Sequence, residues 1–379
     1  MSWFKRDRGA EQASTAPEPV GGAQSAGSRV VVDGSVISWP LEDRVAGLEA
    51  VRARKGSANF VHIDFPDDGT EHNAIERARK DPAAREALVG LAREEFYLYK
   101  HAGSRSSFVS RRRLPQLWQP VKEGRIKDSA SGTLYELEPA LNPAGPPKLL
   151  VVFPAMGAPI YAPSLFRYAT RNYKSIQKFV SPSTTVMRLV DLGGVVGNFY
   201  LDTAVLPTNA ASIQATIRAV MDELGVAQED VVLLGSSKGA TGAVFHGLSM
   251  GLKHVAVDPV LHEEHYWEKH NDSHFTRETT FDLTKQEIFA ELIKGLEAEG
   301  RMDEALSKQV LITSERSPQY EYIAPLLIDG RSTNVVLVNT NEGIKDHPDV
   351  PVFSHHVASS TTDLLLSGVP LVAGRREID

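Results

Sequence analysis

The sequence of 379 residues contains no cysteine, so disulfides, thiolate metal ligands and a cysteine nucleophile are all excluded. No uninterrupted apolar run approaches the roughly 20 residues of a membrane-spanning helix, and the first residues, MSWFKRDRGAEQ, lack the apolar stretch of a signal peptide. Acidic residues outnumber basic ones, 48 against 41, and the net charge is −7. A general nucleic-acid binder is usually basic, so we expect a cytoplasmic protein without a nucleic-acid partner or a membrane span.

What is present is typical of a globular protein: 42% hydrophobic and 23% charged residues. Residues 1–28 are rich in Ala, Gly, Ser, Pro and Glu, a composition that predicts a disordered tail. Residues 29–124 form a second unit of mixed character, and residues 125–379 form a third. The oligomeric state cannot be derived from the sequence.

The region 29–124 is predicted to be an α+β accessory region. SRVVVDGSVISW and ANFVHIDF have the composition of short strands. The stretch DPAAREALVGLAREEFYLYKHA is predicted to be one helix, capped by Asp81 and with Pro82 in its first turn. No motif in this region points to a reaction.

The region 125–379 alternates strands and helices. KLLVVF is apolar without alternation, which indicates a strand buried on both faces of a parallel sheet. Further strands are expected at TTVMRLVD, DVVLLG, HVAVDP, QVLITSE and NVVLVNT, with helices between most of them. The pattern predicts an α/β fold with a mostly parallel sheet and helices on both faces.

A tight turn in VVLLGSSKGATGAVFHG, residues 231–247, carries the main chemical signal. Its pentapeptide Gly235–Gly239 fits G-x-S-x-G, in which a strained strand-to-helix turn exposes the middle serine as a nucleophile. Ser237 is that serine, whereas Ser236 is expected to point back into the fold. The alternatives are a purely structural turn and a phosphate-binding turn, although the P-loop spacing is absent.

A serine nucleophile needs oxyanion donors, a base and an acid. We expect the donors to be the backbone N–H groups of Lys238 and, in the loop after KLLVVF, of Met156, with Ala155 or Gly157 as neighbours.

The base is expected late in the chain, because the order on such folds is Ser, acid, His. We predict His356, with His355 as an alternative and His347 as an outside candidate. The predicted acid is Glu315, in the loop after QVLIT. Asp258, at the end of HVAVDP, is its rival and Asp346 comes third.

The stretch LHEEHYWEKHNDSHF, residues 261–275, contains four histidines but not the H-E-x-x-H spacing, so no metal site is predicted. It is expected to form a roof over the serine, with Tyr266 and Trp267 as substrate-binding residues or as plain core. Asn198 and Tyr200, in the loop after the strand ending at Asp191, are further substrate-binding candidates because ligands bind at this edge of such sheets.

Three segments, LLVVFPAMG, RLVDLGGVVGNFYLDT and VVLLGSSKGATGAVFHGLSMGLKHVAVDP, resemble the XcbB/CpsF family of capsular polysaccharide biosynthesis proteins. They are more distantly similar to the acetyltransferase component of accessory secretion systems. The resemblance covers residues 125–379 and implies an α/β-hydrolase-like domain. It assigns the nucleophile to Ser237, the base to His356 or His355, and the acid to Glu315, with Ser317 standing where many hydrolases have an aspartate.

The expected activity is therefore serine-dependent acyl transfer or ester hydrolysis on a polysaccharide, a glycan or its precursor. No cofactor is implied beyond acyl-CoA as a possible donor. The alternatives are an esterase, thioesterase or peptidase acting on a small metabolite, and a non-catalytic binding or scaffold member of a polysaccharide assembly.

Overall fold

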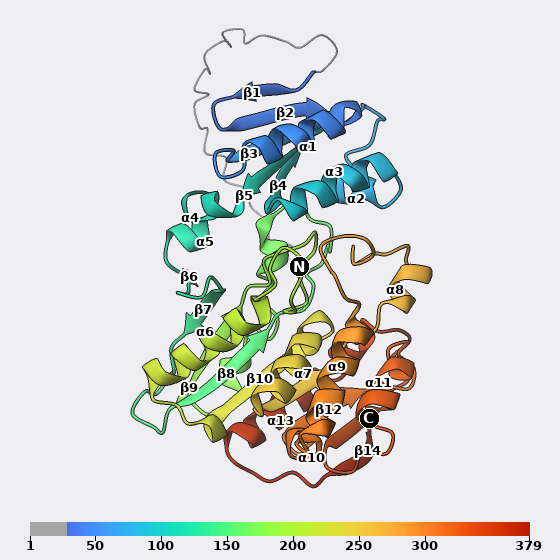
Figure 1. Cartoon of the computed structure of the whole chain (residues 1–379). Coiled ribbons are helices and arrows are strands. Elements are labelled where there is room, and N and C mark those ends of the chain that lie inside the picture. Colours follow the sequence, from blue (N-terminus) through green and yellow to red (C-terminus); the bar gives the residue numbers. More distant parts are fainter. Residues whose placement is uncertain (1–28) are drawn as a thin grey trace, which may run out of the picture.

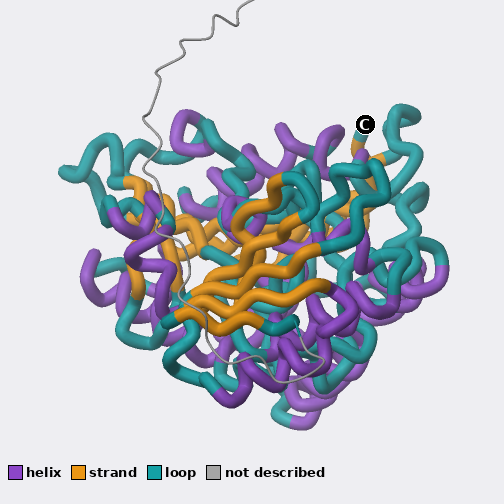
Figure 2. The backbone as a smooth tube through the Cα atoms, turned by 90° about the horizontal axis from the view of Figure 1, so that it is seen from above, coloured by secondary structure: helices purple, strands orange, loops and turns teal. Residues whose placement is uncertain are grey.

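The computed structural model describes residues 29–379, so the tail predicted for residues 1–28 lies outside the described residues. Two sheets organise the chain. A five-stranded sheet lies near the N-terminus, and a nine-stranded sheet follows it. In Figure 1 the smaller sheet lies above the larger one, and from above the strands lie in the middle of the molecule with helices around them (Figure 2).

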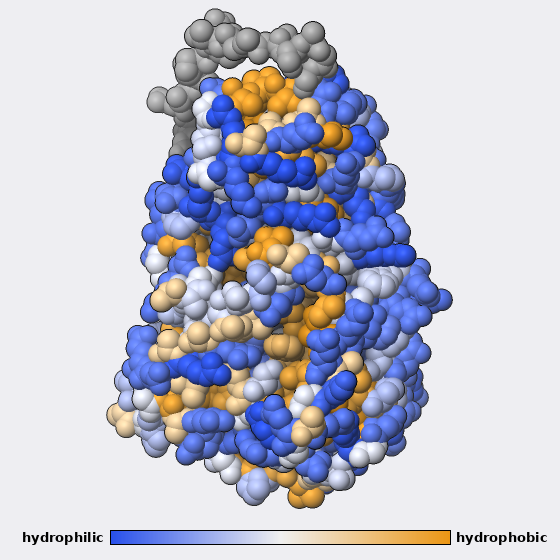
Figure 3. All heavy atoms as spheres, viewed as in Figure 1, coloured by the Kyte–Doolittle hydropathy of each residue, from blue (hydrophilic) through white to orange (hydrophobic). Residues whose placement is uncertain are grey.

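The smaller sheet has the strand order β1-β2-β3-β5-β4, and two helices, α1 and α3, pack on it. Its elements are β1 (Val31–Asp33), β2 (Val36–Pro40), α1 (Arg44–Ala53), β3 (Phe60–Asp64), α2 (Ala74–Ala78), α3 (Pro82–Arg93), β4 (Phe96–Ala102) and β5 (Arg105–Ser110). The edge strand β1 is exposed: Val31 and Val32 are 55% and 39% accessible. Hydrophobic atoms are visible at that end of the molecule in Figure 3.

The helix predicted from Asp81 is shorter than expected. Asp81 caps α3, its side chain accepting the N–H of Ala83, and Pro82 occupies the first turn as predicted. The helix ends at Arg93, and Glu95 has a positive φ of 58°. The following FYLYKHA is the strand β4, because its aromatic residues pack in a sheet and not on the helix.

Short helices α4 (Leu114–Leu117) and α5 (Gln119–Lys122) lead to the larger sheet, whose order is β14-β13-β12-β11-β10-β8-β9-β7-β6. Every pair from β14 to β9 is parallel, and β7 is antiparallel to both of its neighbours. The strands are β6 (Ile126–Asp128), β7 (Leu134–Glu138), β8 (Lys148–Phe153), β9 (Thr184–Leu189), β10 (Val231–Ser236), β11 (Lys253–Val257), β12 (Gln309–Thr313), β13 (Val335–Asn339) and β14 (Gly374–Ile378).

Helices cover both faces of this sheet. One face packs against α6 (Asn209–Leu224), α7 (Lys238–Met250), α9 (Lys285–Ala298), α10 (Met302–Leu306) and α11 (Tyr320–Leu327). The other packs against α12 (Asp349–Phe353), α13 (His355–Leu366) and the segment 173–180. Since the central strands have apolar side chains on both faces, they are buried on both sides. The predicted α/β fold, a mostly parallel sheet with helices on both faces, is confirmed.

Candidate active site

The chain turns sharply from β10 into α7 at Ser237, whose φ of 52° and ψ of −123° are strained for a residue with a side chain. The flanking glycines make this turn possible. A Cβ on Gly235 would lie 2.1 Å from the carbonyl oxygen of Gly239, and one on Gly239 would lie 1.9 Å from that of Phe153. The N–H of Ser237 donates to the Val257 carbonyl over 2.9 Å, so the turn is tied to the end of β11.

Two hydrogen bonds join Ser237 to an imidazole and a carboxylate. Ser237 Oγ lies 2.7 Å from His347 Nε2, and His347 Nδ1 lies 2.7 Å from Asp258 Oδ2. The carboxylate accepts from Nδ1–H, which leaves Nε2 unprotonated and able to accept from the serine. Ser237 and Asp258 follow the adjacent strands β10 and β11, whereas His347 comes from the loop between β13 and α12.

Asp258 is fully buried and is held by two hydroxyl groups besides His347. Thr313 Oγ1 donates to Oδ1 over 2.7 Å, and Ser317 Oγ donates to Oδ2 over 2.5 Å. Both donors come from β12 and the loop that follows it. The loop after β12, in which Glu315 was expected to be the acid, therefore supplies Ser317 instead. The Ser317 hydroxyl orients the Asp258 carboxylate at the end of the neighbouring strand β11.

The structure places the predicted acid and bases elsewhere. Glu315 is exposed and forms an ion pair with Arg375 on β14. His355 and His356 begin α13 and are exposed, and the His355 ring stacks on Tyr173. The expected geometry was wrong for all three, since none of them contacts Ser237. The imidazole beside the serine is that of His347, named above as an outside candidate, because the β13 loop passes the serine before α12 begins. The chain order Ser, acid, His is retained with Asp258 and His347.

The two expected oxyanion donors lie on adjoining turns. The Lys238 N–H is at the first position of α7, where it has no acceptor within the helix. Met156 follows β8, on which α7 packs closely at Gly239. The N–H of Ala155 donates to Asn172 Oδ1 over 2.8 Å. In residues 29–379 no protein acceptor is found for the Met156 N–H, which leaves it available for a ligand.

The side chain of Lys238 turns away from this site into a buried ion pair. Its Nζ lies 2.8 Å from Asp191 Oδ2, and both side chains are 1% exposed. Asp191 also accepts the backbone N–H groups of Asn198, Phe199 and Tyr200 at 3.1–3.2 Å. This carboxylate therefore fixes the loop after β9 against the start of α7.

The two substrate-binding candidates in that loop differ. Tyr200 is fully buried, and its hydroxyl donates to the Pro154 carbonyl over 2.6 Å, so it supports the loop after β8 and has no surface for a ligand. Asn198 is 1% exposed, but neither of its side-chain polar atoms has a partner.

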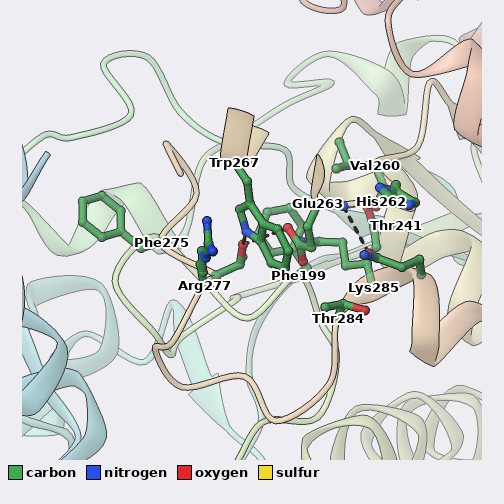
Figure 4. Close-up of polar contacts among 12 residues, drawn as sticks. Phe199, Thr241, Val260, His262, Glu263, Trp267, Phe275, Arg277, Thr284 and Lys285 are labelled. Carbon is green, nitrogen blue, oxygen red and sulfur yellow. Dashed lines mark hydrogen bonds and ion pairs between the residues drawn. The ribbon is translucent and has the colours of Figure 1, made fainter. Parts of the chain in front are cut away.

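Residues 261–284 form a roof after β11, which includes α8 (Glu264–Glu268). The ring of Tyr266 lies 6.4 Å from that of His347 and 3.7 Å from that of His274. Burial lowers the pKa of His274 well below its usual range, so its ring is neutral. Trp267 donates its indole N–H to Thr276 Oγ1 over 2.9 Å and faces the Arg277 guanidinium (Figure 4). Within residues 29–379, no group of three or more His, Asp or Glu side chains is placed to hold a metal ion.

Arginines of the N-terminal region hold this roof. Arg79 donates to the His270 carbonyl over 2.6 Å, Arg85 pairs with Asp272, and Arg93 donates to the Thr279 carbonyl over 2.9 Å. The roof segment between these contacts contains four residues with positive φ: Asn271, Asp272, Phe275 and Glu278. The accessory region thus holds the segment of the roof in which these strained residues lie.

No family model and no curated protein matches the chain, so the resemblance to the XcbB/CpsF family stays a prediction. Solved structures with partial similarity include a hyperthermophilic esterase from the archaeon Pyrobaculum calidifontis. Its sequence is 14% identical, the alignment covers 65% of this chain and 83% of the esterase, and the TM-score is 0.43. A glycosylation-associated protein complex (Gap123) from Streptococcus agalactiae is 12% identical, covering 70% and 51%, TM-score 0.42. FphF, a fluorophosphonate-binding serine hydrolase of Staphylococcus aureus, is 14% identical, covering 64% and 96%, TM-score 0.43.

None of the helices in residues 29–379 is long and apolar enough to cross a membrane.

Proposed function

We propose that the chain is a serine-dependent acyl-transfer enzyme or esterase. The observation that carries this proposal is the unbroken line of hydrogen bonds from Ser237 Oγ through His347 to Asp258, with the serine on a strained turn. Ser237 Oγ attacks an ester or thioester carbonyl while His347 Nε2 takes its proton. Asp258 keeps the imidazole in the required tautomer and stabilises the imidazolium.

The negative oxygen of the tetrahedral intermediate would receive the backbone N–H groups of Lys238 and Met156. As this intermediate collapses, the carbon–oxygen or carbon–sulfur bond to the leaving group breaks, and His347 returns the proton to that group. The acyl group is then held as an ester on Ser237. Water or a hydroxyl of an acceptor attacks this ester by the same proton transfers in reverse and releases the serine.

A fluorophosphonate probe tests the proposal, because it labels only an activated serine. We expect labelling of the full-length chain, none in Ser237→Ala, and a strong loss in His347→Gln. The matched control is His356→Gln, a histidine on the surface of α13, which should label like the unaltered chain. Labelling that persists in His347→Gln but disappears in His356→Gln would overturn the assignment of the base. Absence of labelling in the folded chain would favour a non-catalytic binding or scaffold role.

The acceptor is part of the same proposal. A roof over the serine supports transfer, since excluding water protects an acyl-enzyme from hydrolysis. The resemblance in sequence favours a glycan hydroxyl as acceptor and acyl-CoA as donor. Incubation with acetyl-CoA and candidate glycans, with product analysis by mass spectrometry, separates acetylated glycan from free acetate. Free acetate alone would favour an esterase or thioesterase acting on a small metabolite.

A further inference from the structure

A cavity of about 460 Å³ lies beside the loop that follows β8, and its lining is strongly cationic. The charged lining residues are five cations and one carboxylate: Arg125, Arg167, Arg171, Lys174, Arg188 and Glu136. The lining therefore has a net charge of +4, although the whole chain has a net charge of −7. We call it the cationic cavity.

Arg167 lies in the wall of this cavity without a negative partner. Its side chain is 6% exposed, and its guanidinium donates only to neutral groups: the carbonyls of Leu98, Ser164 and Val195 and the Tyr168 hydroxyl, at 2.6–3.1 Å. No carboxylate of residues 29–379 lies within ion-pair distance of it. A buried charge is costly unless an opposite charge compensates it. An anion in the cavity would supply that charge.

The remaining cations also exceed their partners. Arg125 and Arg171 both pair with Glu136, at 3.2 and 2.6 Å. Arg171 and Arg188 share a second carboxylate, that of Glu138. Three arginines thus share two carboxylates.

Arg125 and Arg171 are 42% and 41% exposed, so each has N–H groups open to the cavity. Lys174, on the cavity rim, is exposed and has no ion-pair partner among the described residues.

The cationic cavity adjoins the loop after β8, which also carries the Met156 oxyanion candidate. The residues Pro154, Gly157, Ala158 and Pro159, on either side of the Met156 oxyanion candidate, form one wall. Asn172 connects the two sites: its side chain accepts the Ala155 N–H, and its carbonyl accepts from Arg188 over 2.6 Å. Both sites lie at the carboxyl ends of neighbouring parallel strands, where ligands of such folds bind.

We propose that the cationic cavity binds a phosphate or diphosphate group of the substrate whose acyl ester reacts at Ser237. Arginine forks match phosphate oxygens geometrically. After Glu136 and Glu138 are counted against the five cations, three positive charges remain. A single carboxylate would neutralise only one of them, whereas a diphosphate neutralises two or three. This inference rests on the proposed function for the reaction, but the binding itself requires only the cavity.

Binding of inorganic pyrophosphate to the full-length protein, measured by isothermal titration calorimetry, tests the proposal. We expect saturable binding that weakens about tenfold, or about 1.4 kcal/mol, in Lys174→Gln and in Arg125→Gln. Both side chains are exposed, that of Arg125 by 42%, so these variants should fold. Lys178→Gln is the matched control, because Lys178 is an exposed cation four residues along the chain that does not line the cavity.

Three results would overturn the proposal: no pyrophosphate binding to the folded protein, an equal loss in Lys178→Gln, or glucuronate binding as tightly as pyrophosphate. The fluorophosphonate experiment tests the serine chemistry independently of the pyrophosphate titration, which tests the cationic cavity. Labelling without pyrophosphate binding would reject only the cationic cavity as a subsite. Pyrophosphate binding without labelling would reject the serine chemistry and leave an anion-binding protein.

Discussion

Removal of the buried cation Lys285 should destabilise the protein strongly. Its Nζ lies 2.5 Å from Glu263 Oε1, and the two side chains are 0% and 1% exposed (Figure 4). The ammonium also lies 3.6 Å from the centre of the Phe199 ring. Burial lowers the pKa of Lys285, while the charge of Glu263 opposes that shift.

In Lys285→Met the Glu263 carboxylate keeps only the hydroxyl of Thr276, at 2.8 Å, as a side-chain donor. Breaking a buried pair by removing one partner costs about 3–5 kcal/mol. Domains are stable by only about 5–15 kcal/mol, so this variant should lose a large part of the free energy of unfolding. The double variant Lys285→Met/Glu263→Leu should lose less than the single one, because no uncompensated charge remains.

Urea unfolding followed by circular dichroism measures both variants. The control is Lys308→Met, which breaks an exposed pair with Glu304 and should change the urea midpoint little. The reasoning is refuted if Lys285→Met loses no more stability than this control, or if the double variant is less stable than the single one.

Three further predictions concern the turn, acid stability and the roof. Gly239→Ala should prevent correct folding, because the added Cβ would lie 1.9 Å from the carbonyl oxygen of Phe153. Gly295→Ala is the control: it has open space in α9 and should stabilise the protein by about 0.5–1 kcal/mol. Thermal melts compare the two variants. Burial lowers the pKa of His254 to about 4, so the unfolded chain binds more protons than the folded one below pH 6.5. Stability should therefore fall between pH 6.5 and 4 by about 1.4 kcal/mol per pH unit for this group, a slope that His254→Gln should reduce in urea titrations. Arg85→Gln should speed hydrogen exchange in residues 270–280 without a matching effect of Arg105→Gln, which alters a pair within the small sheet.

The sheet and the nucleophile could be predicted because their signals are local. KLLVVF and VVLLG are apolar without alternation, and a serine between two close glycines has few structural alternatives. Gly235 and Gly239 must be glycine because a side chain at either position would clash with backbone atoms. The sequence motif therefore predicts the geometry of the turn directly.

The partners of the serine, Asp258 and His347, were named from the sequence only as alternatives, because the choice among the candidates depends on where the loops cross. Glu315 and Ser317 are two residues apart, yet one points to solvent and the other to Asp258. The path of the β13 loop decides which of three histidines reaches the serine, and nothing in residues 340–356 encodes that path locally. One signal was available: Asp258 ends a buried strand expected at the same sheet edge as Ser237.

Of the three residues proposed to carry the reaction, Ser237 and Asp258 follow the paired strands β10 and β11, whereas His347 does not follow a strand directly. Paired strands sit about 4.8 Å apart whatever their loops do, so the hydroxyl and the carboxylate keep their spacing as long as the sheet survives. The imidazole of His347 lies on a separate loop, between β13 and α12. A shift of that loop alone would therefore break the hydrogen bond to Ser237, on which the proposed activity depends, while the sheet stayed intact.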